Sequence, residues 1–123
     1  MLIPNLYQVN KTEKIDESNI NVQIELNSNH EIFKGHFPGN PITPGVCMMQ
    51  IIKELVEDFT NEKLILSKVS NVKFMAKINP FVQPILDLNL NISNEEGLIK
   101  VKNSSYFNET NALKFSASFR ITA

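Results

Sequence analysis

The feature of this sequence that most constrains the fold is a single apolar segment with helical spacing, which runs from about Gly45 to Phe59. Its apolar residues recur as they do on one broad face of a helix, at Met48, Ile52, Leu55, Val56 and Phe59. Pro44 stands just before the segment, where a proline suits the start of a helix. Because the helix is apolar over a wide arc, we expect the rest of the chain to cover it.

Most of the remaining apolar segments alternate apolar and polar residues, as half-buried strands do. We predict strands at residues 20–28, 64–78, 84–93, 98–107 and 113–122, the second with a soft break at Ser70-Asn71. Turn signals at 94–97 and 108–111 join the last three strands as hairpins. This order of elements predicts an α+β fold with one long central helix and a mainly antiparallel sheet. An edge strand left open in such a sheet invites pairing with a second copy of the chain.

Length and composition limit the class of protein. The 123 residues fit one domain, residues 1–123, and the contents of 42% hydrophobic and 20% charged residues are ordinary for a soluble protein. A formal net charge of −1 gives no general basic field for nucleic acid or a membrane surface. No apolar run approaches a membrane span, and the N-terminus lacks the pattern of a signal peptide, so we expect a cytoplasmic protein. The only cysteine, Cys47, excludes an internal disulfide, and no carboxylate lies at ligand spacing beside His36, so we expect no metal site.

Residues 34–45, just before and at the expected helix start, concentrate the residues that shape a backbone. Three of the four glycines and three of the six prolines surround His36 there. Such a loop would hold the imidazole near the unpaired N–H groups of the helix start, which can polarise a carbonyl oxygen. A histidine beside them can remove a proton from the adjacent carbon. The residues alone leave two interpretations open: proton abstraction next to a thioester-like carbonyl, or a structural turn with a hydrogen-bonded histidine.

The motif GHFPGNPITPGV at residues 35–46 resembles the signature of the β-hydroxyacyl-acyl-carrier-protein dehydratases, which have the hot-dog fold. The segments NHEIFKGHFPG (29–39) and VKFMAKINPFVQP (72–84) resemble further parts of that family. The resemblance implies a curved antiparallel sheet around the helix, and a homodimer whose sheets join edge to edge, with higher assemblies built from dimers. It implies no cofactor of the protein's own, because the substrate is carried on the phosphopantetheine of acyl carrier protein or on coenzyme A. Lys73 and Lys77 are either solvated or contacts for such a carrier.

The resemblance also implies roles for individual residues. His36 would be the general base, and the N–H of Gly45 would hold the thioester oxygen. An acid on the helix of the other subunit would complete each site. The residues expected to line the substrate site are Val46, Phe37, Pro38, Phe33 and Met49.

The sequence departs from the family at the acid. Gln50 stands where the family has Glu or Asp, and Glu54 stands one helical turn later, where the family commonly has Gln. A carboxamide can form hydrogen bonds but cannot act as an acid. Because residues four apart share a helix face, Gln50 and Glu54 are either a swapped pair in contact, or Glu54 is a surface residue. Cys47, in the first helical turn, is expected in the core, although a thiolate at a helix start can be reactive. Met48 and Met49 either line an acyl tunnel or belong to the core.

We therefore predict dehydration of β-hydroxyacyl-acyl-carrier-protein thioesters to trans-2-enoyl thioesters. Two alternatives remain on the same fold. One is an acyl-thioester hydrolase, in which a polar residue of the helix positions water. The other is a catalytically reduced acyl-binding subunit.

Overall fold

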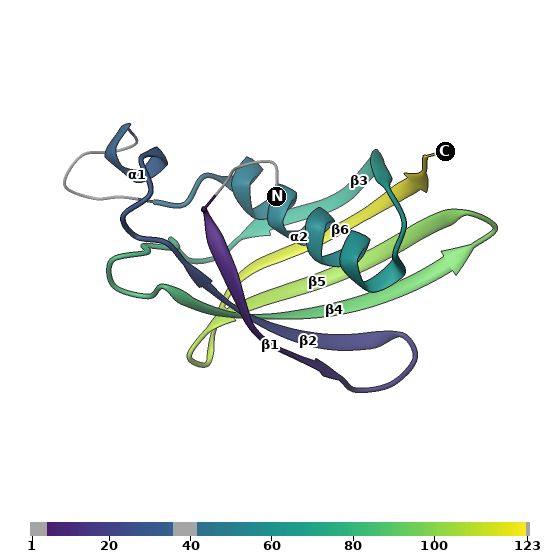
Figure 1. The fold of residues 1–123 in the computed structure, drawn as a ribbon, viewed down its shortest axis with the longest axis horizontal. Coiled ribbons are helices and arrows are strands. Elements are labelled where there is room, and N and C mark those ends of the chain that lie inside the picture. The colour runs from purple at the N-terminus through teal and green to yellow at the C-terminus, as the bar shows by residue number, and fades with distance from the viewer. Residues whose placement is uncertain (1–4, 36–41, 123) are drawn as a thin grey trace.

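The computed structural model describes residues 5–35 and 42–122, which form two helices and one sheet (Figure 1). In chain order the elements are β1 (Tyr7–Lys14), β2 (Asn19–Leu26), α1 (Ile32–Gly35), α2 (Gly45–Thr60), β3 (Leu64–Phe74), β4 (Ile85–Glu95), β5 (Leu98–Phe107) and β6 (Thr110–Ile121). The long helix α2 and the strands at 20–28, 84–93, 98–107 and 113–122 lie where the sequence predicts them, within a few residues at the ends. The predicted α+β class is therefore confirmed.

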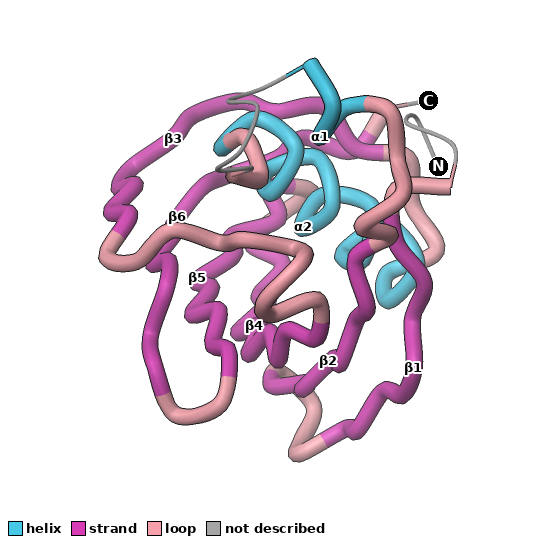
Figure 2. The backbone as a smooth tube through the Cα atoms, turned by 90° about the vertical axis from the view of Figure 1, so that its left-hand side faces the viewer, coloured by secondary structure: helices cyan, strands magenta, loops and turns pink. Residues whose placement is uncertain are grey.

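All six strands belong to one antiparallel sheet in the order β1-β2-β4-β5-β6-β3. The sheet curves around α2, so that the helix lies in the hollow of the sheet (Figure 2). The strands β1 and β3 are the two edges. The start of α2 lies close to the segment that leaves β3, which matters for the site described below.

The core forms where the apolar face of α2 meets the inward face of the sheet. Alternate residues of β4 and β6 point to the helix and are buried, whereas their neighbours are more exposed. The helix contributes its own buried face, which consists of Cys47, Met48, Ile51, Ile52, Leu55 and Val56. Cys47 is thus a small buried hydrophobe, as expected, and burial raises the pKa of its thiol.

Two features of the sheet differ from the sequence prediction. The sequence pattern does not predict β1, because only Tyr7 at its first position is buried and the other seven residues are exposed. An edge strand needs only backbone pairing with β2, which leaves no apolar pattern to detect. The predicted strand 64–78 is wrong at its end, because β3 ends at Phe74. The soft break at Ser70-Asn71 is a shift of register between Val69 and Asn71, so the strand continues through it.

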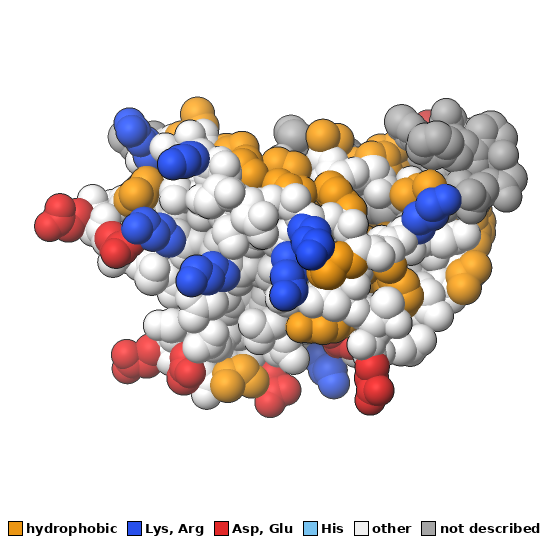
Figure 3. Space-filling view, turned by 180° about the vertical axis from the view of Figure 1, so that it is seen from behind, with side chains coloured by type: hydrophobic (Ala, Val, Ile, Leu, Met, Phe, Trp, Pro, Cys, Tyr) orange, Lys and Arg blue, Asp and Glu red, His pale blue; other side chains and the backbone are white. Residues whose placement is uncertain are grey.

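The face of the sheet that points away from α2 is rich in Lys and Arg side chains (Figure 3). On β5 and β6 they occupy exposed positions that alternate with the buried ones, at Lys100, Lys102, Lys114 and Arg120. The outer face of these strands is therefore solvated.

Candidate active site

The start of α2 has no side-chain cap hydrogen bond from the residues that the structure describes. Pro44 is the N-cap residue, and its side chain has no group that could cap the helix. Its carbonyl oxygen accepts hydrogen bonds from the N–H groups of Cys47 and Met48, at 3.0 and 3.3 Å. The N–H of Thr43 donates to the carbonyl oxygen of Ile78 at 2.8 Å, which ties the approach to the helix to the chain beyond β3.

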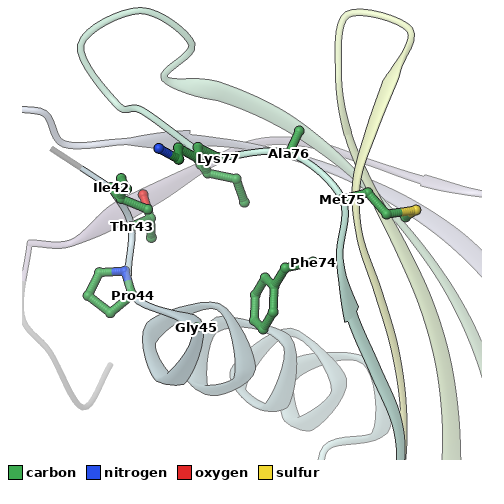
Figure 4. Close-up of a pocket in the computed structure, with 9 residues that line it drawn as sticks. Ile42, Thr43, Pro44, Gly45, Phe74, Met75, Ala76 and Lys77 are labelled. Atoms are coloured by element: carbon green, nitrogen blue, oxygen red, sulfur yellow. The ribbon is translucent and has the colours of Figure 1, made fainter. Parts of the chain in front are cut away.

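Gly45 is the first residue of α2, and its lack of a side chain allows a close contact. A Cβ atom placed on Gly45 would lie 2.6 Å from Cζ of Phe74, the last residue of β3. The Phe74 ring therefore lies directly against the helix start, and a side chain at position 45 would meet it (Figure 4).

A cavity of about 490 Å³ opens at this helix start, and we call it the helix-start cavity. Its lining is Ile42, Thr43, Pro44, Gly45, Phe74, Met75, Ala76, Lys77 and Ile78. The walls are mostly apolar, Gly45 supplies backbone, and the Lys77 side chain extends on the side of Ile42 and Thr43 (Figure 4). The Thr43 hydroxyl is buried and has no hydrogen-bond partner among the residues that the structure describes. Such a cavity can take an apolar chain and present helix-start N–H groups to a carbonyl oxygen.

A second hollow of about 340 Å³ lies further along the helix, and we call it the Gln50 groove. Its lining is Val46, Met49, Gln50 and Lys53 from α2, Ile65 and Leu66 from β3, and Phe115 and Phe119 from β6. Gln50 and Lys53 are the polar residues of this otherwise apolar lining. The groove runs along the edge strand β3, so it lies at the border of the sheet.

Gln50 and Glu54 are in contact, as the swapped-pair interpretation requires. Nε2 of Gln50 donates to Oε2 of Glu54 at 2.9 Å, and the Tyr7 hydroxyl donates to Oε1 of Glu54 at 2.8 Å. Glu54 is half-buried and bonded on both oxygens, so it is not the simple surface residue of the alternative interpretation. Burial, and then the hydrogen bond and charge of Glu54, raise the pKa of Tyr7 far above its usual value, so the phenol keeps its proton.

Tyr7 is the site residue that the sequence does not reveal. It lies 47 residues from Glu54 and at the start of a strand that has no apolar pattern. Its one detectable signal is a large aromatic residue beside a polar stretch, which does not identify a partner.

The other predicted site residues are placed as follows. Gly45 lines the helix-start cavity, and Val46 and Met49 line the Gln50 groove. Phe33 is 3% exposed and lies in the core, so its contact with substrate stays a prediction. His36, Phe37 and Pro38 lie outside the described residues.

Gly45 and Gln50 line different hollows of the part of the chain that the structure describes. The step of five helical positions from one to the other corresponds to about 7.5 Å along the axis, and each of them lines a different hollow. A site that uses both groups on one substrate therefore needs more than either one of these two hollows.

No helix within residues 5–35 and 42–122 is both long and apolar enough to cross a membrane.

Comparison with protein families and curated proteins gives consistent matches. The model of the ApeI-like family, described as ApeI dehydratase, matches residues 11–110. The 3-hydroxyacyl-[acyl-carrier-protein] dehydratase FabZ of Levilactobacillus brevis is 32% identical over 90 residues, which are 64% of this chain and 61% of that protein. The protein of the same name from Caldanaerobacter subterraneus is 29% identical over 112 residues, 82% of this chain and 79% of that protein. The match thus spans about three-fifths of the length of the first relative.

Solved structures show the fold. The dehydratase heterocomplex ApeI:P from Xenorhabdus doucetiae superposes with a TM-score of 0.74 at 19% identity, covering 92% of this chain and 96% of that one. A hypothetical thioesterase with coenzyme A from Streptococcus pneumoniae superposes with a TM-score of 0.65 at 11% identity, covering 95% and 86%. These likenesses confirm the hot-dog fold, a helix wrapped by a curved antiparallel sheet.

Proposed function

Because the chain belongs to the ApeI-like dehydratase family, whose model matches residues 11–110, we propose that it dehydrates β-hydroxyacyl thioesters to trans-2-enoyl thioesters. The observation that carries the proposal is this match together with the uncapped start of α2, where Gly45 lines a mostly apolar cavity. The carrier of the acyl chain is acyl carrier protein, as in the names of the FabZ relatives, with coenzyme A as the other candidate.

The chemistry assigns one role to each end of the substrate. The N–H of Gly45 donates to the thioester oxygen and stabilises the negative charge that develops there. His36 takes the proton from the α carbon, and the electron pair of that C–H bond forms the double bond as the C–O bond to the β-hydroxyl breaks. Gln50 cannot supply the proton that the leaving oxygen needs. The imidazolium of His36 therefore returns the proton to it, so that water leaves and His36 ends neutral.

Gln50 contacts the β-hydroxyl of the substrate in this proposal, and Glu54 holds Gln50. The 2.9 Å hydrogen bond between Gln50 and Glu54 supports this assignment, because it ties the carboxamide to a fixed partner. His36, Gly45, Gln50 and Glu54 thus form the proposed catalytic group, with Val46 and Met49 beside the acyl chain.

The working form that we propose is a homodimer joined through β3. This edge strand leaves apolar side chains uncovered on the side of the sheet that faces α2, at Leu66, Val69, Val72 and Phe74. The other edge strand, β1, exposes one large apolar side chain, Val9, among polar and charged residues, so β3 is the more apolar of the two edges although it also carries Lys68 and Lys73. A second copy at β3 would cover the Gln50 groove and bring its own helix start toward it. The heterocomplex named for the Xenorhabdus protein makes a different partner subunit the alternative.

The test is incubation with β-hydroxyacyl and saturated acyl thioesters on both carriers, with products read by mass. Dehydration predicts loss of one water from the hydroxyacyl substrates and no change in the saturated ones. Release of free acid from either substrate would instead show hydrolysis, in which Gln50 positions water. No product from either would contradict dehydration by this chain alone and favour an acyl-binding subunit.

The His36→Ala variant tests the assignment of the base. Loss of a general base typically lowers the rate by about 10²–10⁴-fold, and the fold should remain because one side chain is shortened. Urea unfolding of the variant and the native protein checks the second point. Activity within a few-fold of the native value would remove His36 from the mechanism.

A further inference from the structure

The hydroxyl of Tyr7 and the carboxamide of Gln50 are joined through one carboxylate. Tyr7 comes from the edge strand β1, Gln50 from α2, and the two oxygens of Glu54 accept one hydrogen bond from each, at 2.8 and 2.9 Å. The chain of bonds thus connects the N-terminal strand to the helix position where the family has its acid.

The direction of these bonds orients the carboxamide. An ionised carboxylate only accepts hydrogen bonds, so the NH₂ end of Gln50 must face Glu54. The carbonyl oxygen of Gln50 then points away from Glu54, and Gln50 also lines the Gln50 groove. A Gln side chain without such a partner could present either end, because its two ends have nearly the same shape.

Tyr7 in turn keeps Glu54 in place. The Tyr7 side chain is 8% exposed, and its ring belongs to the core cluster, so its hydroxyl has a fixed position. Loss of this hydroxyl removes one of the bonds that hold the carboxylate. The carboxylate of Glu54 is then held less firmly, and its hold on the Gln50 amide weakens.

We propose that Tyr7 is a positioning residue of the active site, which acts through Glu54 to hold Gln50 with its carbonyl oxygen toward the substrate. The inference rests on the proposed function, since Gln50 must contact the β-hydroxyl. The oxygen accepts a hydrogen bond from that hydroxyl and directs its C–O bond for elimination. Tyr7 itself does not contact the substrate.

The kinetic test uses Tyr7→Phe, with Tyr106→Phe as the matched control on the only other tyrosine. We expect kcat of Tyr7→Phe to fall about tenfold at unchanged KM, which is the equivalent of one hydrogen bond to a charged group. Tyr106→Phe should keep the native kcat. In a Gln50→Ala background the Tyr7→Phe change should cost nothing further, because the group that it positions is gone.

A spectroscopic test examines the same link without turnover. In ¹⁵N-labelled protein the side-chain NH₂ signal of Gln50 is identified as the one that Gln50→Ala removes. We expect the chemical shift of this signal to change in Tyr7→Phe and to remain the same in Tyr106→Phe. If Tyr7→Phe does not fold, Glu54→Gln takes its place, because it keeps the shape of the side chain and removes the one-way acceptor.

The outcomes separate the two levels of the argument. A native protein that releases no water from any β-hydroxyacyl thioester overturns the proposed function, while the NH₂ signal still decides the geometry. A native protein that does dehydrate, with a Tyr7→Phe variant at native kcat and an unmoved Gln50 signal, overturns the positioning role. If Tyr7→Phe lowers kcat equally in the native and in the Gln50→Ala background, Tyr7 supports the fold alone.

Discussion

The environment of the Thr43 hydroxyl is expected to lower the free energy of unfolding. Its hydroxyl is buried without a hydrogen-bond partner among the described residues, and a buried unsatisfied polar group costs about 1–3 kcal/mol. Thr43→Val keeps the shape and removes the hydroxyl. We expect the free energy of unfolding, measured in urea, to rise by about 1 kcal/mol.

Thr60→Val is the matched control for this change. The Thr60 hydroxyl donates to the carbonyl oxygen of Val56 at 2.9 Å, so its removal loses a bond and should not stabilise the protein. If Thr43→Val lowers the free energy of unfolding, the Thr43 hydroxyl has a partner in the folded protein and the reasoning fails.

Gly45 is constrained by space, not by backbone conformation. A methyl group there would meet the Phe74 ring, but that ring is 54% exposed and can swing aside. We expect Gly45→Ala to change the free energy of unfolding by no more than about 1 kcal/mol, since alanine also favours the helix. Turnover should fall about tenfold or more, because misplacement near the reacting carbonyl is costly.

The double variant Gly45→Ala/Phe74→Ala separates space from chemistry. Removing the ring makes room for the methyl group, so kcat/KM should recover relative to Gly45→Ala alone. Native turnover in the single variant would mean that the thioester does not bind at this helix start.

At the scale of elements, the period of apolar residues in the sequence predicts those helices and strands that bury one face. The helix α2 and the strands β2, β4, β5 and β6 bury one face each, so their apolar residues repeat with the period of the element. The strand β1 buries only its first residue, and the end of β3 is set by where the chain turns back to contact Thr43. Neither feature leaves a period in the sequence.

In the candidate site, too, some contacts follow from the sequence pattern and others do not. The contact of Gln50 with Glu54 follows from helical spacing, so it could be predicted. The contact of Tyr7 with Glu54 depends on how the sheet curves around α2, and the close approach of Phe74 to Gly45 depends on where β3 ends. Contacts of this kind are determined by tertiary packing, which a single sequence does not display.

The exposed apolar residues of the edge strand β3 lead to a prediction about assembly. Val69 and Val72 are each 37% exposed on the edge of the sheet, and a buried lysine there would be costly in a dimer. We expect Val69→Lys and Val72→Lys to convert the proposed dimer to monomer in sedimentation at micromolar concentration. Val9→Lys on the opposite edge strand, where Val9 is 45% exposed, should leave the dimer intact. Equal behaviour of all three variants would exclude β3 as the interface.

At the scale of the whole molecule, the separation of Gly45 and Gln50 into two hollows bears on how the sites are shared. If each site takes His36 and Gly45 from one subunit and Gln50 from the other, two defective chains can complete one site between them. A mixed dimer of His36→Ala with Gln50→Ala, isolated with two affinity tags, should then have about half the native turnover, because one of its two equivalent sites is intact.

The opposite mixed dimer decides between shared and separate sites. It pairs a native chain with a chain that carries both His36→Ala and Gln50→Ala. Shared sites leave no intact site in this dimer, because each of the two lacks one group, so turnover should fall to the level of the single variants. Sites built within one chain would reverse both results: this dimer would keep about half of the native turnover, and the first mixed dimer would have only residual activity. Since both dimers contain the same two substitutions, differences in folding or assembly cannot produce such a reversal.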